Sequence, residues 1–137
     1  MLKLAQQQVD EIFAHARASL PNECCGLLGG RDDSVSSIYK SKNIAAKPLV
    51  EYEAAPEDLF RAQKLMRERG ETLVGIYHSH PRQSEPVPSE TDVRRAFYPL
   101  AVYFIVGFQN EEPVLRAFRI YEAEQRWTPV RFEILEC

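Results

Sequence analysis

The fold class is decided by one apolar stretch in the second half of the chain, Leu100-Ala-Val-Tyr-Phe-Ile-Val-Gly107. No charged residue interrupts it, and a continuous apolar run of this length is typical of a strand that is covered on both faces. A strand of that kind requires a layer of structure above it and another below it. The sequence therefore predicts an α/β sandwich, in which a mixed β-sheet is flanked by helices.

Hydrophobic periodicity and turn residues predict the elements around this stretch. Helices are expected over roughly the first twenty residues, which Pro21-Asn22 would end, over 56–70, where Pro56 suits a helix start and Gly70 a helix stop, and from Ser89 onward. Further strands are expected at 25–30, 35–40, 49–53, 73–80, 114–121 and 130–134. Because no repeat, low-complexity tract or linker separates these elements, residues 1–137 are interpreted as a single domain.

The charge balance argues against several classes of protein. The 137 residues include 17 Lys and Arg and 20 Asp and Glu, giving a formal net charge of −3 without a basic run. Nucleic-acid binding is therefore not expected. The longest apolar stretch is too short to span a bilayer, and the first residues lack the apolar segment of a secretory signal. We thus expect a cytoplasmic protein that does not act at a membrane.

The three cysteines, Cys24, Cys25 and Cys137, do not form a disulfide framework. Their number is odd, and a bridge between the two adjacent residues would be strained. No C-x-x-C spacing of a structural zinc site is present either. The cysteines therefore favour a reducing compartment.

Two histidines at the end of a predicted strand indicate a metal site. Side chains at positions i and i+2 of a strand point to the same face, so His78 and His80 can converge on one ion. Asp92 is the natural third ligand, because the loop after His80 leads into a short helix that can bring this carboxylate back. Two histidines and one carboxylate leave a fourth tetrahedral position for water, as in catalytic zinc sites. Zinc lowers the pKa of such a water from about 16 to roughly 7.

Several of these residues also have structural interpretations. His15 lies in a predicted helix with no partner in view, and we interpret it as structural. Ser89, three residues before Asp92, is a near capping box that requires no metal. The two interpretations are compatible, since a capped helix start would hold Asp92 rigidly. The general base stays open at this point, with four candidates near the predicted site: Glu23, Glu71, Glu85 and Glu90.

Taken in order along the chain, these residues resemble the motif of the JAMM metalloproteases, the catalytically competent MPN domains. That motif is a distant Glu, then His-Ser/Thr-His-Pro, a spacer, and Ser-x-x-Asp. The corresponding residues here are Glu23, His78-Ser-His80-Pro81 and Ser89-Glu-Thr-Asp92. The segment Pro21-Asn-Glu23-Cys-Cys25-Gly26-Leu-Leu-Gly-Gly is also similar to the family's Pro-x-Glu-x-Cys-Gly-x-Leu-x-Gly, and Asn43 and Pro56-Glu-Asp-Leu59 match as well.

The resemblance implies an MPN sandwich, similar to that of cytidine deaminases, and a role for each motif residue. His78, His80 and Asp92 would be the zinc ligands, and Glu23 would be the general acid/base. Ser89 would donate a hydrogen bond to the tetrahedral oxyanion. One feature departs from the family pattern: eight residues, 81–88, separate His80 from Ser89 where seven are common. A one-residue bulge in the loop is expected to absorb the difference.

Within this family, small single-domain members resemble bacterial peptidases that trim the C-terminus of ubiquitin-like sulfur-carrier proteins. The expected function is therefore zinc-dependent hydrolysis after a C-terminal Gly-Gly of such a partner, while the oligomeric state stays open. A non-catalytic MPN scaffold is the main alternative, although such domains typically lose ligands. A thiol hydrolase using Cys24 or Cys25 is a third possibility, disfavoured because an apolar strand disfavours a thiolate. The deaminase signature H-x-E with P-C-x-x-C is absent from the sequence.

Overall fold

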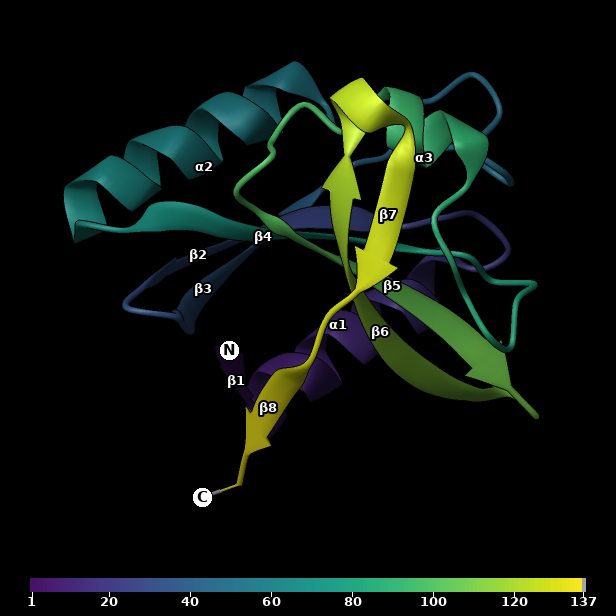
Figure 1. The fold of residues 1–137 in the computed structure, drawn as a ribbon, viewed down its shortest axis with the longest axis horizontal. Coiled ribbons are helices and arrows are strands. Elements are labelled where there is room, and N and C mark those ends of the chain that lie inside the picture. The colour runs from purple at the N-terminus through teal and green to yellow at the C-terminus, as the bar shows by residue number, and fades with distance from the viewer. Residues whose placement is uncertain (137) are drawn as a thin grey trace.

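The computed structural model describes residues 1–136, which form one eight-stranded sheet with helices packed against it (Figure 1). The elements follow one another as β1 (Leu2–Ala5), α1 (Gln6–Ser19), β2 (Cys25–Arg31), β3 (Ser34–Ser41), α2 (Pro56–Arg69), β4 (Thr72–Ser79), α3 (Glu90–Arg94), β5 (Val102–Gln109), β6 (Glu112–Tyr121), the 3-10 helix η1 (Glu122–Glu124), β7 (Arg126–Pro129) and β8 (Phe132–Leu135).

The sheet is mixed, as the sequence predicts. Its strand order is β7-β6-β5-β4-β2-β3-β1-β8. The central strand β4 pairs in parallel with β5 and antiparallel with β2, and β1 pairs in parallel with both β3 and β8. The α/β fold class is thereby confirmed, and β4, which contains His78 and ends one residue before His80, lies inside the sheet.

Alternating side chains of the central strands build a core on each face of the sheet. Tyr77 and Phe104 belong to the core that the buried face of α1 completes, whereas Ile76 and Tyr103 belong to the core that contains residues of α2 and α3. Figure 1 shows α1 and α2 on opposite sides of the sheet. Since His78 has the parity of Ile76, its side chain points to the face covered by α2 and α3.

The start of the chain differs from the prediction of a helix over the first twenty residues. The first four residues after Met1 form β1, and α1 begins only at Gln6. Leu2 and Leu4 are buried while Lys3 is exposed, which is the alternation of a strand at a sheet face. The helix begins where the side chain of Gln8 turns back, since its Oε1 accepts a hydrogen bond of 2.8 Å from the amide of Ala5. The alternation of Leu2 and Leu4 with Lys3 indicates a strand, and the prediction of a helix did not take it into account.

Two other strand predictions are also wrong in part. Residues 49–53 do not form a strand, and nearby an isolated bridge joins Asn43 and Ala54. The strand predicted at 130–134 is β8, which begins only at Phe132, so that Val130 lies between β8 and the preceding strand β7. Cys137, assigned above to the unbridged cysteines, lies outside the described residues. No helix within residues 1–136 combines the length and the hydropathy that a transmembrane span requires.

Candidate metal centre

The strand register brings Glu23 to the histidine pair. Cys25 of β2 pairs with His78 of β4 in an antiparallel ladder, so Glu23, two residues before Cys25, comes opposite His80, two residues after His78. Hydrogen bonds extend this contact beyond the ladder, because the amide of Ser79 donates to the Cys24 carbonyl at 3.2 Å. Residues far apart in sequence thus meet at the carboxyl end of β4.

His78, His80 and Asp92 form a close triangle of possible ligand atoms. The Nε2 atoms of the two histidines lie 3.1 Å apart, and Oδ2 of Asp92 lies 3.0 Å from each of them. All three side chains are buried. Glu23 offers a further oxygen, which belongs to a looser set with the two histidines in which all atoms lie within 4.8 Å. The structure therefore brings together all three ligands expected from the sequence, with the expected acid/base beside them.

The geometry and the chemistry of this triangle fit a metal ion. Tetrahedral zinc holds nitrogen and oxygen ligands at about 2.0–2.2 Å, which places neighbouring ligand atoms about 3.3–3.6 Å apart. The observed separations are only slightly shorter. In addition, Oε1 of Glu23 is buried and has no hydrogen-bond partner among residues 1–136, an arrangement that is costly unless a bound group satisfies it. A buried Glu/His/His/Asp group of this kind suggests a metal centre.

Asp92 is held by the helix cap that the sequence indicates. Oγ of Ser89 accepts a hydrogen bond of 3.0 Å from the amide of Asp92, and the amide of Ser89 donates to Oδ2 of Asp92 at 2.9 Å. The same Asp92 oxygen thus caps α3 and faces both histidines. Because Oγ of Ser89 uses only its acceptor capacity in this cap, its hydroxyl hydrogen is left to donate to another group. The two interpretations of Ser89 are indeed compatible in this geometry.

The local environment shifts the pKa values of the acidic groups in opposite directions. Burial raises the pKa of Glu23 to about 8, an effect that the nearby His80 reduces and Asp92 reinforces. Burial would also raise the pKa of Asp92, but the facing His78 and His80 hold the pKa of Asp92 well below its ordinary value. One carboxylate is therefore kept ionised against the histidines, while the other is close to the range in which a group accepts and returns a proton at neutral pH.

Gln83, which the sequence analysis did not single out, supports His80 from behind. Its Oε1 lies 3.2 Å from Nδ1 of His80 and also accepts from the amide of Val87 at 3.3 Å. Because the Val87 amide can only donate, the Gln83 atom between them is the oxygen, and His80 carries its proton on Nδ1. That tautomer leaves Nε2 of His80 free as a metal ligand. Nδ1 of His78, by contrast, has no hydrogen-bond partner among residues 1–136.

Asn43 and Tyr52 form a second group near the histidines. The sequence analysis noted Asn43 as a motif match and did not identify Tyr52. Both Asn43 amide hydrogens are used, by the carbonyls of Glu23 at 3.0 Å and Glu51 at 2.9 Å, and its Oδ1 accepts from the amides of Ala45 and Glu53. The loop that these bonds hold carries Tyr52, whose ring stacks on His78 with centroids 4.3 Å apart and planes 23° apart. The loop thereby forms one wall of the metal centre.

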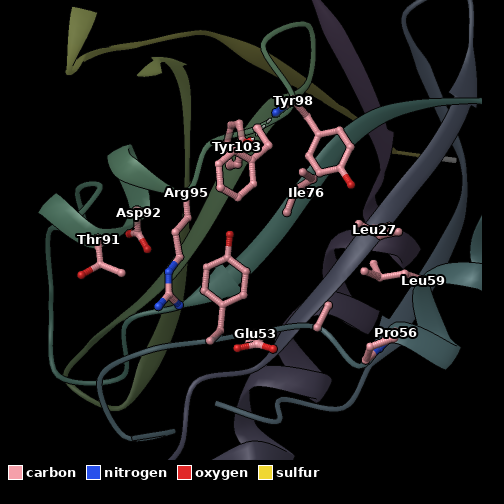
Figure 2. Close-up of a pocket in the computed structure, with 13 residues that line it drawn as sticks. Leu27, Glu53, Pro56, Leu59, Ile76, Thr91, Asp92, Arg95, Tyr98 and Tyr103 are labelled. Atoms are coloured by element: carbon pink, nitrogen blue, oxygen red, sulfur yellow. Dashed lines mark hydrogen bonds between the residues drawn. The ribbon is translucent and has the colours of Figure 1, made fainter. Parts of the chain in front are cut away.

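Two recesses open beside the triangle. The larger, of about 530 Å³, is mostly apolar and includes Asp92; its lining residues are Leu27, Tyr52, Glu53, Ala54, Pro56, Leu59, Ile76, Thr91, Asp92, Arg95, Phe97, Tyr98 and Tyr103. Figure 2 shows Asp92 and Arg95 on one side of this recess and Pro56 and Leu59 on the other. The smaller recess, of about 190 Å³, is lined by Glu23, Leu49, Val50, His80, Pro81, Arg82, Gln83 and Ser89.

The other general-base candidates are engaged elsewhere. Glu71 accepts hydrogen bonds from Ser36, Ser37 and Tyr39, away from the histidines. Glu85 and Glu90 are exposed and face arginines, Arg116 at 3.8 Å and Arg94 at 3.4 Å. Among the four candidates, Glu23 is the one that the structure brings to the metal centre.

The thiol-hydrolase alternative has little support in this environment. Cys24 and Cys25 are both buried, and burial raises their pKa values to about 11 and about 12. Thiols with such values are protonated at neutral pH and are poor nucleophiles. His15, the one histidine distant from the triangle, contacts the hydroxyl of Tyr77 at 2.7 Å, which agrees with its structural interpretation.

A mixed sheet whose central strand ends in two histidines, with an aspartate and a glutamate beside them, defines a metallopeptidase-like protein of the JAMM/MPN class. Residues 5–121 match the family of prokaryotic homologs of the JAB domain, and the chain belongs to that family. The resemblance seen in the sequence is thereby confirmed.

Similar proteins with names or known structures support this membership. The chain is 42% identical over 110 residues to the desampylase of Haloferax volcanii, an alignment covering 76% of this chain and 78% of the relative. It is 31% identical to the CysO-cysteine peptidase of Mycobacterium tuberculosis, covering 95% and 90%. A protein from Desulfitobacterium hafniense has a similar structure, with a TM-score of 0.85 and 35% identity over 99% of this chain and 94% of its own.

Proposed function

We propose that the protein is a zinc-dependent peptidase that hydrolyses the peptide bond after the C-terminal Gly-Gly of a ubiquitin-like sulfur-carrier protein. The observation that carries the proposal is the buried triangle of His78, His80 and Asp92, with separations of 3.0–3.1 Å, and Glu23 beside it. A scaffold would not need four converging polar side chains, whose burial is costly without a ligand. We further propose that residues 1–137 act as a single domain.

In this proposal His78, His80 and Asp92 hold the zinc ion. When bound, the ion acts as a Lewis acid that lowers the pKa of water to about 7 and polarises the substrate carbonyl. The cap formed by Ser89 fixes the Asp92 carboxylate, and the Gln83 oxygen fixes the His80 ring. The chain thus provides an ordered set of three ligands and leaves room for water and substrate.

The proposed role of Glu23 is to move the proton. Its carboxylate takes a proton from the attacking water and later gives it to the nitrogen of the leaving amine. Burial raises the pKa of Glu23, the direction that helps a carboxyl group hold the proton between these two steps. The Ser89 hydroxyl, whose hydrogen is not used in the cap, donates to the oxygen of the tetrahedral intermediate.

The larger recess suits the tail of the carrier protein. It is mostly apolar, it reaches the metal centre at Asp92, and the exposed aromatic side chains of Phe97 and Tyr98 lie at it. The reacting carbonyl would lie close to the histidines and to Tyr52, whose ring stacks on His78. Glycine lets the tail approach closely there, because it carries no Cβ. The relatives named for desampylation and for CysO-cysteine cleavage agree with a small protein partner.

We expect the zinc-loaded protein to cleave a sulfur-carrier fusion immediately after Gly-Gly. The measurement is mass spectrometry of the products from a carrier that bears a short C-terminal extension. The matched control is the same fusion with both glycines changed to alanine, which adds two Cβ atoms next to the scissile bond and should be cleaved far more slowly. Cleavage at another bond, or equal cleavage of both fusions, would contradict the proposed substrate.

Gln83 provides a separate test of the metal centre. Replacing it by leucine removes the acceptor behind His80, and loss of such a partner typically weakens metal binding by about 10- to 100-fold. Gln83→Glu keeps an acceptor at that place and should bind zinc at least as tightly as the wild type. Competition with a coloured chelator measures both affinities, and NMR of the His80 ring reports the tautomer. Equal affinities for the wild type and Gln83→Leu would show that the contact does not orient the ligand.

A further inference from the structure

The two recesses beside the metal centre differ in size and chemistry. They have no lining residue in common: the larger meets the triangle at Asp92, and the smaller meets it at His80. A peptide whose scissile bond lies at the triangle therefore extends into both recesses. The part that supplies the scissile carbonyl enters one recess, and the part that supplies the scissile nitrogen enters the other. Which recess receives the leaving group is decided by the proton that the leaving amine requires.

Glu23 assigns the direction of the substrate. The leaving nitrogen must lie within hydrogen-bond reach of the group that protonates it. Glu23 lines the smaller recess together with Ser89, whereas the larger recess includes neither. The amine side of the scissile bond consequently faces the smaller recess, and the carrier tail occupies the larger one.

The smaller recess has the chemistry of an amino-acid site. At about 190 Å³ it has little more than a third of the volume of the larger recess. Leu49 and Val50 form an apolar wall, and the cation is Arg82, which makes no ion pair with a carboxylate of residues 1–136. Beside Arg82, the Gln83 oxygen is occupied by His80 and Val87, so the Gln83 amide nitrogen remains as a second donor.

We infer that the smaller recess is a leaving-group subsite for a single amino acid, whose free α-carboxylate is bound by Arg82. The inference rests on the proposed peptidase function and adds its preferred leaving group. Guanidinium and carboxylate form charge-assisted, often bidentate hydrogen bonds, which give this site its selectivity. Arg82 is thus a specificity-determining residue and takes no part in the chemical step.

The reaction that the subsite serves is a simple hydrolysis. The oxygen of one water molecule forms a bond to the glycine carbonyl carbon, and the bond between that carbon and the leaving nitrogen breaks. The proton that Glu23 took from the water goes to this nitrogen. The products are a carrier that ends in a Gly-Gly carboxylate and one free amino acid, which leaves through the recess of Arg82.

The test compares two carrier fusions that end in Gly-Gly-Leu, one with a free carboxylate and the other with a C-terminal amide. We expect the zinc-loaded wild type to cleave the free acid with a kcat/KM about 10- to 100-fold higher, as a charged hydrogen-bonded pair warrants. Arg82→Ala should lower cleavage of the acid to the level of the amide and leave the amide unchanged, while Arg82→Lys should retain part of the preference. Arg95→Ala, in the larger recess, is the matched control and should keep the preference for the acid.

Other results would contradict parts of the proposal. Equal cleavage of acid and amide by the wild type, or an equal loss on both in Arg82→Ala, would overturn the leaving-group subsite while the peptidase function stands. Loss of the preference in Arg95→Ala alone would show that the substrate runs in the opposite direction. If the zinc-loaded wild type cleaves neither fusion, the proposed function itself is wrong, and the subsite is wrong with it.

Discussion

Replacing Glu23 by glutamine is expected to lower turnover by about 100- to 10,000-fold while zinc stays bound. Glutamine has nearly the shape of glutamate, so it should fit the buried position without disturbing the backbone bonds to Asn43 and Pro48. It cannot accept and return a proton in the same way, however, and the leaving amine then has no acid beside it. The measurements are kcat on the Gly-Gly fusion and the zinc content of the same sample.

Glu85→Gln is the matched control for this experiment. Glu85 is an exposed carboxylate of the loop between His80 and Ser89 and contacts Gln109 at 3.0 Å. Its substitution should leave both turnover and zinc content close to wild type. A Glu23→Gln variant that keeps a near wild-type rate would transfer the acid/base role to another carboxylate, and one that loses zinc would make Glu23 a ligand.

Removal of one histidine of the triangle is expected to abolish stoichiometric zinc binding. His80→Ala leaves two of the three proposed ligands, Nε2 of His78 and the Asp92 carboxylate, and a catalytic zinc site usually needs three protein ligands. The stabilisation that zinc gives to the folded state should disappear with it. At a free zinc concentration 100 times its Kd, that stabilisation is about 2.7 kcal/mol for the wild type. Elemental analysis and thermal unfolding with and without a chelator measure the two effects.

His15→Ala provides the comparison for the loss of a histidine as such. His15 is bonded to the Tyr77 hydroxyl on the α1 face of the sheet, so its removal should reduce stability without changing zinc stoichiometry. If His80→Ala binds as much zinc as wild type, or if His15→Ala loses the ion, the proposed metal centre is wrong.

Much of the fold could be predicted from the sequence because its central elements have strong local patterns. The apolar run behind β5 and the Pro56 and Gly70 boundaries of α2 led to the correct elements within a few residues. The peripheral strands were harder. β1 has only four residues, of which Leu2 and Leu4 carry the alternation, and its partner β8 lies at the other end of the chain. Pairing between such distant short segments leaves almost no local signal.

The candidate site likewise contains residues with a strong local sequence signal and residues without one. His78, His80 and Asp92 could be proposed as a group because strand periodicity and a helix cap place side chains in a known direction. Their roles as ligands remain a prediction, as does the cytoplasmic location. Gln83 and Tyr52 could not be found in this way, since a loop has no periodicity that says where its side chains point. Both act through contacts that exist only after the 81–88 and 44–54 loops have folded onto the histidines.

The four hydrogen bonds of Asn43 have a consequence for how this protein can diverge. Three of them, to Ala45, Glu51 and Glu53, close the loop from Ala45 to Glu53 at its base, and the tip of that loop carries Leu49 and Val50. Lengthening a closed loop costs little chain entropy, only about 0.6 kcal/mol for each doubling. Insertions after Val50 can therefore reshape the wall that meets the released amino acid while the bonds of Asn43, the hydrogen bond from the Glu23 amide to the Pro48 carbonyl and the ligands stay in place. The length of this segment can therefore vary, in evolution or in design, while the ligands keep their positions.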